Sequence, residues 1–228
     1  MAREAFKPGH DVDARVARML PRMPIFPLPD VVLFPGAMLP LHIFEPRYRE
    51  MTEAVLAGTG VLGMATLVEA DSKAELPPIH RIIGIGEIVA HEQLPDGRYN
   101  LLLRGISRAT VDLELPPVHP YREVQAHRLD DIEDDSKATS AAARALMAMT
   151  DRLATTLPTG GDRLRALARS ADGPARLADV LAAALISAGD TRRELMEDVV
   201  VARRLDRLLS EVGVLVANLG PNKDSAPN

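Results

Sequence analysis

One of the most apolar stretches of the chain is also rich in proline, namely residues 23–48, MPIFPLPDVVLFPGAMLPLHIFEPRY. The prolines are Pro24, Pro27, Pro29, Pro35, Pro40 and Pro46. Proline lacks a backbone N–H and does not fit inside helices or central strands, but strand starts, edge strands, bulges and turns tolerate it. Such a segment can bury its apolar side chains only as short strands joined by sharp corners. This favours a small, strongly bent barrel over a flat sheet, and the prolines also protect strand edges from pairing with other chains.

Two short strands are expected within this stretch. The β-branched run 31–34 (VVLF) is typical of one, and 39–44 (LPLHIF) of the other. Period-two alternation assigns one face of the second strand to the core, namely Leu39, Leu41 and Ile43. Between the two strands, Pro35-Gly36 predicts the tightest corner of the segment, with a positive φ at Gly36.

A short helix and a β-hairpin follow. Pro46 stands where a first helical position belongs and Gly58 where a helix should stop, so 45–58 predicts a helix inside the β region. Further on, Pro95-Asp96-Gly97 has turn chemistry between two long apolar runs and predicts a hairpin over 86–105. Further strands are expected at 106–114 and 121–129.

The pattern of apolar residues changes after residue 135, from short runs between prolines and glycines to stripes at helical spacing. Apolar stripes at helical spacing predict about four packed helices, the first stripe being Ala142, Leu146, Met149, Leu153 and Leu157. Asp172-Gly173-Pro174 is a helix start, and 191–194 (TRRE) is typical of a capping box that opens a helix running to about residue 217. The expected organisation is an extension (1–22), a β lobe with one short helix (23–135), a helical lobe (136–218) and a disordered tail (219–228).

Charge is distributed unevenly between these regions. Residues 24–135 hold 9 Lys and Arg against 18 Asp and Glu, a net charge of −9, although the whole chain carries only −5. The acidic run 130–135 (DDIEDD) stands where the composition shifts and is interpreted as a solvated linker.

The composition also bounds the cellular setting. The chain has no cysteine, which excludes disulfides and thiolate metal sites. There is no run of ~18 apolar residues, so no membrane span is expected. The first 22 residues are charged throughout and lack the apolar core of a signal peptide. A cytoplasmic protein that does not associate with membranes is predicted.

No motif of a catalytic, metal or cofactor site is present. The sequence holds no phosphate-binding loop, and 84–89 (GIGEIV) lacks the third glycine of a dinucleotide fingerprint. Its glycines are interpreted as relief of crowding on a bent strand. The six histidines show no i, i+4 pairing, so no metal site is predicted. Catalytic residues, cofactors and metals are therefore expected to be absent.

Three stretches of the sequence resemble a known protein family. PIFPLPDVVLFPGAMLPLHIFEPRYREM and GEIVAHEQLPDGRYNLLLRGISRA closely resemble the N-terminal substrate-binding domain of the Lon ATP-dependent proteases (peptidase S16 family), and 194–212 resembles the long helix near its end. HIFEPRY is particularly similar to bacterial members that consist of this domain alone. The resemblance covers roughly residues 22–217. It implies an α+β fold, a PUA-like bent β-barrel followed by an α-helical bundle.

In full-length Lon an ATPase module and a Ser-Lys peptidase module follow this domain. The residues of this sequence offer no positions onto which those catalytic groups map. The resemblance therefore implies a non-catalytic protein that is associated with proteolysis through binding.

The resemblance implies binding of unfolded or apolar protein segments, or docking of a separate protease or chaperone, while a homodimer stays open. The candidate binding residues are Phe34, Pro35, Gly36, Met38, Leu39, Phe44 and Tyr48, and the competing interpretation is that each belongs to the core. Two alternatives remain. PUA-like barrels elsewhere bind RNA, for which Arg98, Arg104, Arg108, Arg122 and Arg128 could form a stripe, but the net charge disfavours nucleic acid. A small-molecule pocket as in cereblon needs aromatic residues, and this chain has no tryptophan.

Overall fold

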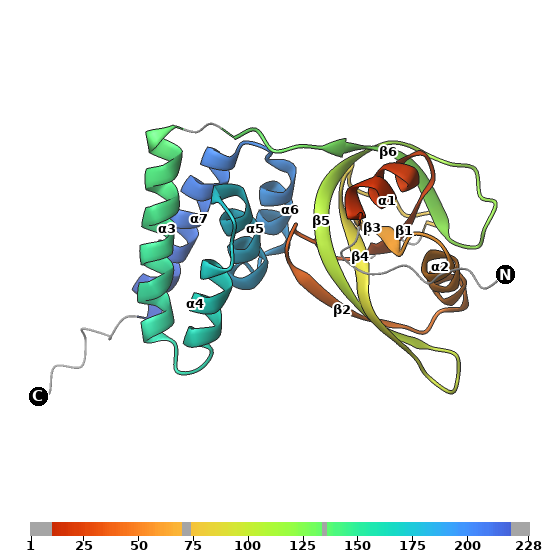
Figure 1. The fold of residues 1–228 in the computed structure, drawn as a ribbon, viewed down its shortest axis with the longest axis horizontal. Helices are drawn as coiled ribbons and strands as arrows, with labels where there is room; N and C mark the ends of the chain where they lie inside the picture. Colours follow the sequence, from red (N-terminus) through yellow and green to blue (C-terminus); the bar gives the residue numbers. More distant parts are fainter. Residues whose placement is uncertain (1–10, 70–73, 134–135, 220–228) are drawn as a thin grey trace, which may run out of the picture. The chain divides into compact units, whose positions relative to one another are not determined.

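The computed structural model describes residues 11–69, 74–133 and 136–219. They form two compact units, each with its own core (Figure 1). The first unit runs to Asp130 and takes in Arg192–Glu197, and the second comprises Asp131–Thr191 and the chain from Asp198 onward. None of the helices within the described residues is long and apolar enough to cross a membrane.

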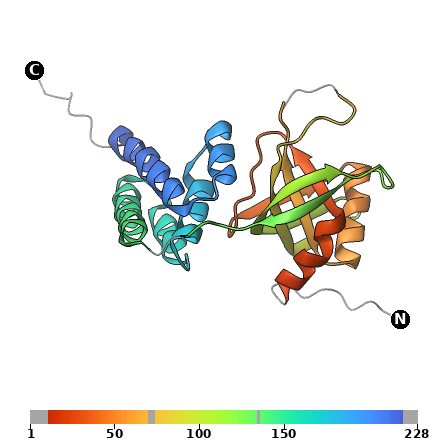
Figure 2. The ribbon, with the colours of Figure 1, turned by 90° about the horizontal axis from the view of Figure 1, so that it is seen from above.

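Six strands and two helices build most of the first unit. The helices are α1 (Val12–Met19), which a short 3₁₀ turn (Leu20–Arg22) follows, and α2 (Pro46–Ala57). The strands are β1 (Met23–Leu28), β2 (Met38–Ile43), β3 (Val61–Thr66), β4 (Ile82–Gln93), β5 (Tyr99–Glu114) and β6 (Arg122–Leu129). Figure 2 shows both helices against the strands.

The strands pair in the order β2-β5-β4-β3-β1-β6, and β6 also pairs with β5. Five strands therefore close on themselves, while β2 and β6 share one side of β5, with β2 along residues 99–104 and β6 along 108–114. Two register shifts in the β4–β5 pair add to the bend. The predicted α+β class is confirmed, although the barrel is irregular because β2 pairs with β5 outside the ring of five strands.

The two sides of this sheet bury two cores. The first is enclosed by all five barrel strands and closed by α1, with residues such as Val16, Ile25, Val61, Ile85, Ala109 and Val124. The second lies on the other side of β3, β4 and β5, where α2 covers it, with residues such as Tyr48, Met51, Leu62, Ile88 and Leu103. Residues 12–22, which the sequence suggested as part of an extension, thus contribute to the barrel core.

The prolines of β1 occupy positions that tolerate them. β1 lies inside the sheet, but Met23–Ile25 pair with β6 alone and Ile25–Leu28 pair with β3 alone. Pro24 and Pro27 therefore each lie in a half of the strand that has a partner on one side only. The missing N–H of each proline can face the unpaired side, as in an edge strand.

Two local predictions are confirmed and one is wrong. The hairpin turn forms as expected, with Gly97 at φ 80° and its N–H donated to the carbonyl of Leu94 at 2.8 Å. Helix α2 starts at Pro46 and stops before Gly58. Residues 31–34, however, form no strand. Val32, Leu33 and Phe34 are buried in an irregular segment, so burial produced the apolar run and strand pairing did not.

The second unit holds α3 (Lys137–Thr156), α4 (Gly161–Arg169), α5 (Pro174–Leu185) and α7 (Val201–Leu219), and α6 (Gly189–Glu197) spans the boundary. The core positions of α7 lie at helical spacing, namely Val201, Leu205, Leu208 and Val212. The predicted start of α5 at Pro174 is confirmed. Residues 136–219 hold five helices instead of about four.

The prediction of one capped helix from 191 to about 217 is wrong. Helix α6 begins at Gly189, so Thr191 already lies in its first turn. The helix stops at Glu197, and the side chain of Asp198 accepts a hydrogen bond from the N–H of Val200 at 2.9 Å before α7 begins. The N–H of Ile132 donates a hydrogen bond to the carbonyl of Val199, and its carbonyl accepts one from the N–H of Val201. These bonds stabilise the interruption between α6 and α7.

Within the acidic run, Asp130 closes the first unit, and Asp131 and Ile132 are anchored to the second unit. The carboxylate of Asp131 accepts a hydrogen bond from the buried guanidinium of Arg204 at 2.7 Å, and Ile132 bridges to Val200. Residues 134–135 of this run, and 220–228 of the predicted tail, lie outside the described residues.

Candidate functional site

The segment between β1 and β2 crosses the sheet where three glycines lie. A Cβ on Gly84 would stand 2.2 Å from the carbonyl oxygen of Leu33, and one on Gly105 would stand 2.0 Å from that of Phe34. Gly86 lies under the side chain of Leu33 in the same way, with 2.8 Å to a Cδ atom. The interpretation of 84–89 as glycines that relieve crowding is confirmed, and the crowding comes from this crossing segment.

Hydrogen bonds fix the corner that ends the crossing. Gly36 has φ 82°, as predicted, and its N–H donates to the carbonyl of Gly105 at 2.8 Å. The N–H of Gly105 donates in return to the carbonyl of Ala37 at 2.8 Å. These bonds set where β2 begins and which of its residues face β5.

Strand β2 presents one face and one edge to solvent. In an antiparallel pair, hydrogen-bonded and non-hydrogen-bonded residues alternate along each strand. Since the carbonyl of Ala37 is bonded to the N–H of Gly105, the backbone groups of residues 39, 41 and 43 also point toward β5. The backbone groups of 38, 40 and 42 therefore point to the outer edge, where no strand of the described chain pairs. Pro40 lies at such an outward position, so its missing N–H interrupts the edge and protects it from extended pairing.

The predicted binding residues divide into exposed and supporting positions. Met38 is 50% exposed and Phe44 is 60% exposed, while Leu39 and Gly36 are half-buried. Phe34, Pro35 and Tyr48 are buried and present no surface. Burial raises the pKa of the Tyr48 hydroxyl, and its ring packs on Phe26 at 4.3 Å between centroids.

The buried members support the exposed ones. Phe34 lies next to the glycine crossing, with the guanidinium of Arg192 5.9 Å from its ring centroid. Tyr48 belongs to the second core, against which Leu39 and Leu41 pack from the inner face of β2. The surface that the structure supports is therefore the outer face of β2, made by Met38, Pro40, His42 and Phe44.

Sequence reasoning missed Pro40 and His42 as members of this face. The signal was present, because the same alternation that assigned 39, 41 and 43 to the core assigns 38, 40, 42 and 44 to the other side. His42 stacks on Phe44 with 6.3 Å between ring centroids. Its Nδ1 lies 2.8 Å from the Asn100 side-chain oxygen, and Asn100 donates to Glu92 at 3.0 Å. The apolar residues are thus bordered by a satisfied polar ladder across three strands.

The arginines of the proposed stripe are engaged with protein groups. Arg98 pairs with Asp96 at 2.6 Å, Arg104 with the buried Glu87 at 2.6 Å, and Arg122 with Glu114 at 2.6 Å. Arg108 is buried and donates to the carbonyl of Met196, and Arg128 pairs with Asp13 and Asp130. These five guanidiniums do not form a track of free cations for phosphates.

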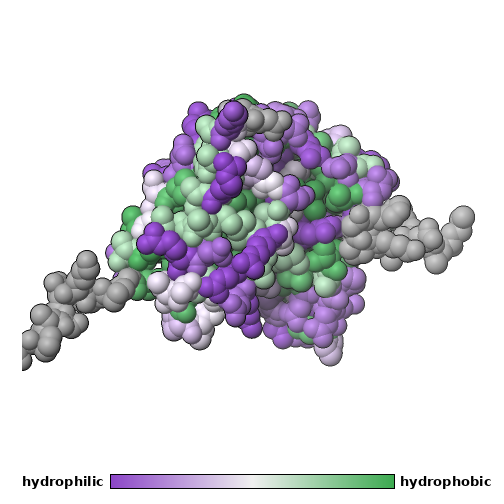
Figure 3. Space-filling view, turned by 60° about the vertical axis from the view of Figure 1, so that its left-hand side comes forward, coloured by the Kyte–Doolittle hydropathy of each residue, from purple (hydrophilic) through white to green (hydrophobic). Residues whose placement is uncertain are grey.

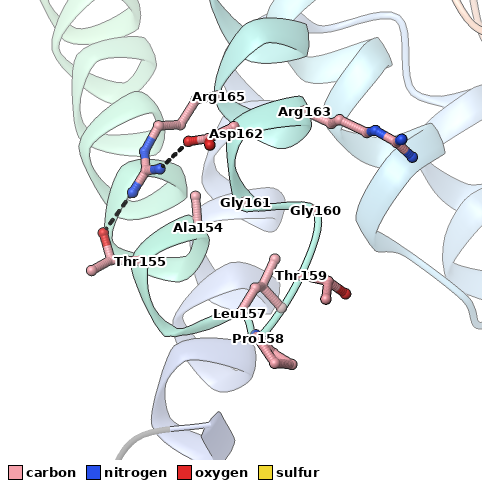
Figure 4. Close-up of a pocket in the computed structure, with 10 residues that line it drawn as sticks. All are labelled: Ala154, Thr155, Leu157, Pro158, Thr159, Gly160, Gly161, Asp162, Arg163 and Arg165. Atoms are coloured by element: carbon pink, nitrogen blue, oxygen red, sulfur yellow. Dashed lines mark hydrogen bonds and ion pairs between the residues drawn. The ribbon is translucent and has the colours of Figure 1, made fainter.

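Two cavities bear on the alternative of a small-molecule pocket. One of about 620 Å³ lies between α3 and α4 and is lined by residues 154–165, with no aromatic side chain (Figure 4). Its Arg165 is already bound to Asp162 and Thr155. The other, about 410 Å³, lies at 114–123 beside Leu76 and has Tyr121 and His119 as its aromatic residues. Neither forms an aromatic cage.

Among the described residues, no group of three or more His, Asp or Glu side chains could hold a metal ion. Exposed apolar side chains also occur away from β2, and on the face drawn in Figure 3 hydrophobic and hydrophilic residues are interspersed. Exposure alone therefore does not single out β2. Its distinction is three outward positions on an edge strand, followed directly by the exposed Phe44, all of which buried residues hold in place.

Comparison with known proteins places this fold. The family model of the ATP-dependent protease La (LON) substrate-binding domain matches residues 22–213, so the chain belongs to that family. Lon protease 1 of Syntrophobacter fumaroxidans is 27% identical over 194 residues, which are 83% of this chain and 23% of the relative. Lon protease of Desulfovibrio desulfuricans is 28% identical over 211 residues, 89% of this chain and 24% of the relative. The chain thus spans about a quarter of the length of these relatives.

Two solved structures share the fold. The N-terminal domain of Mycobacterium avium complex Lon protease has a TM-score of 0.64 at 21% identity, covering 84% of this chain and 98% of that one. The Lon N-terminal domain protein from Xanthomonas campestris has a TM-score of 0.61 at 22% identity, covering 83% and 97%. The predicted family and fold class are confirmed.

Proposed function

We propose that this chain is a non-catalytic binding module that recognises exposed apolar segments of unfolded proteins through the outer face of β2. Membership of the substrate-binding family supports recognition of protein substrates in general. The observation that carries the specific proposal is the pair of half-exposed side chains Met38 and Phe44 at the two ends of the edge strand. Methionine is flexible and polarisable, which suits contact with varied apolar side chains.

The supporting shell gives this surface a defined shape. The glycine crossing and the Gly36–Gly105 bonds fix the start of β2, and the second core holds its inner face. A surface that is rigid before binding loses less conformational entropy when a client docks. Pro40 permits contact with side chains while it limits continuous strand addition at the edge. Docking of a separate protease or chaperone would use the same surface and remains the alternative occupant.

Absence of ATP hydrolysis and of peptide cleavage is part of the proposal, and it rests on the missing phosphate-binding loop. A cytoplasmic location is also part of it and rests on the absence of cysteine. RNA binding is disfavoured because the five candidate arginines are paired or buried and because residues 24–135 carry a net charge of −9.

The test compares single charge insertions on and off the face. Met38→Glu and Phe44→Glu place a carboxylate on the outer face of β2, and Val214→Glu places one on α7, where Val214 is 57% exposed. Binding of fluorescently labelled casein, an unfolded client, is measured for each together with the melting temperature. Loss of one apolar contact of this size weakens binding by about ten-fold.

We expect that loss for both β2 variants, an unchanged melting temperature, and normal binding by Val214→Glu. Equal binding by all three variants would refute the β2 face as the site. A collapse in stability with Met38→Glu would return that residue to the core, since a buried unpaired carboxylate is costly.

A further inference from the structure

A six-residue pattern occurs twice in the first unit. Residues 75–80 read ELPPIH and residues 114–119 read ELPPVH. The first segment precedes β4 and the second follows β5, so they are distant in the sequence. Neither belongs to the β2 face, and the proposed function uses neither of them.

The structure joins the two segments through one arginine. The guanidinium of Arg122 donates to both carboxylate oxygens of Glu114 at 2.6 Å and to the carbonyl oxygen of Pro77 at 2.7 Å. The N–H of Leu115 also donates to the carbonyl of Glu123 at 2.9 Å. Proline fixes φ in both segments, so the region is held before any ligand arrives.

A cavity of about 410 Å³ lies between the two segments. Its wall includes Leu76 from the first segment, Pro116 and Pro117 from the second, and Pro120 and Tyr121 directly after it. Its volume falls in the range of about 300–1,000 Å³ that is usual for binding pockets. The three prolines supply apolar rings and carbonyl oxygens but no N–H, so this wall accepts hydrogen bonds and hardly donates them.

The electrostatics of the cavity favour a cation. Its carboxylates are Glu114 and Glu123, and Glu50 of α2 lies 3.9 Å from the His119 Nδ1 at the same place. Arg122 and Arg22, which pairs with Glu123 at 2.5 Å, neutralise two of these three charges. One negative charge remains. Burial raises the pKa of the Tyr121 hydroxyl, and Glu123 and Glu50 raise it further.

An aromatic platform and two apolar arms complete the site. The His119 and Tyr121 rings are stacked with 4.9 Å between centroids and 3° between planes. Tyr121 is buried, so the face open to a ligand is that of the partly exposed His119 ring. Guanidinium groups stack on aromatic faces in this way. Leu76 is 55% exposed and Val118 is 70% exposed, and both offer contact to an apolar neighbour of the bound cation.

We propose that the cavity between the two ELPP segments binds an arginine side chain of an extended protein segment in which apolar residues flank that arginine. The guanidinium stacks on the outer face of the His119 ring, which the buried Tyr121 ring supports from behind, and takes the acceptors of the proline wall and the excess carboxylate. The flanking apolar side chains pack on Leu76 and Val118. This site is separate from the β2 face and adds a preference for basic residues that the β2 face does not supply.

The experiment is an NMR titration of the ¹⁵N-labelled full chain. The probe is the acetylated and amidated peptide Gly-Ser-Leu-Arg-Leu-Ser-Gly, and its match has glutamine in place of arginine. We expect amide shifts at Leu76, at 118–119 and at 121–123, with the arginine peptide bound roughly three-fold or more tighter than its match.

Two variants distinguish the loss of a negative charge at the cavity from the loss of a negative charge elsewhere on the protein. Glu50 is 54% exposed in its side chain, so Glu50→Gln should fold normally and should reduce the preference for arginine. Asp206→Asn removes one negative charge from an exposed position of α7, outside both proposed sites, and should leave that preference unchanged. Equal affinity for the two peptides, or amide shifts confined to residues 38–44, would overturn the proposal. The second outcome would leave the β2 proposal standing, so the two inferences fail separately.

Discussion

Gly105→Ala tests the crossing of residues 31–37 over the sheet, the feature that positions β2. The new Cβ would stand 2.0 Å from the Phe34 carbonyl oxygen and 2.8 Å from its carbonyl carbon, well inside contact distance. The crossing segment must therefore move by about 1 Å or more. That shift strains both hydrogen bonds between Gly105 and residues 36–37, each worth about 1 kcal/mol.

The movement also disturbs the packing of Leu33 and Phe34, both fully buried. Overpacking of this kind costs about 1–3 kcal/mol. The sum is a loss of about 3 kcal/mol or more in the free energy of unfolding. Because small proteins have urea m-values of about 1–3 kcal/mol per M, the midpoint of unfolding should fall by about 1 M or more.

Tyrosine fluorescence measured in increasing urea follows the unfolding of the first unit separately from that of the helical unit. The chain has three tyrosines and no tryptophan, and Tyr48, Tyr99 and Tyr121 all lie in the first unit. Gly213→Ala is the control, since it lies inside α7 with nothing within 4 Å of the new Cβ. It should stabilise the helical unit by up to about 1 kcal/mol, seen by circular dichroism. A Gly105→Ala midpoint within error of wild type would refute the crossing.

Three further predictions concern buried charge, pH and the unit boundary. Glu87 is fully buried between Arg15 and Arg104. Glu87→Ala should lower the free energy of unfolding of the first unit by about 3–5 kcal/mol, because Arg15 is left buried without its carboxylate partner. A urea midpoint like that of wild type would contradict this. Burial pushes the pKa of Asp198 up, but Arg203, the Val200 N–H and Arg204 outweigh it and hold that pKa below the usual value. The stabilisation from Asp198 is therefore present above the unfolded pKa of about 3.9 and is lost as pH falls through the folded pKa, so the difference in melting temperature between Asp198→Asn and wild type should narrow in acid; a constant difference would refute the pairing. Limited trypsin digestion, followed by mass spectrometry, should cut first near 130–137 or at the termini, and a first cut within 86–105 would contradict the hairpin as a stable element.

Local chemistry made some elements predictable. Pro46 and Gly58 bound α2, and Pro95-Asp96-Gly97 specify their turn without help from distant residues. The positive φ at Gly36 followed from proline-glycine chemistry in the same way. These signals act over a few residues, so the sequence carries them directly.

Other features depended on long-range contacts. The run 31–34 has strand composition, but Leu33 and Phe34 are buried by crossing Gly84 and Gly105, which lie some fifty to seventy residues away. The break between α6 and α7 depends on backbone bonds to Ile132. For the candidate site, period-two alternation separated Met38 and Phe44 from the core positions between them. The burial of Phe34 required the crossing over Gly105 and that of Tyr48 required the second core, and neither could be read from spacing.

The most direct test of the account is site-specific crosslinking to an unfolded client. The chain has no cysteine, so Met38→Cys and Val214→Cys each create a single attachment point for a maleimide-linked benzophenone. Irradiation with casein should give a crosslinked product from position 38 and little from position 214, and an excess of unlabelled casein should suppress it. Equal crosslinking from the two positions, or none from position 38, would contradict the proposal that the outer face of β2 receives apolar protein segments.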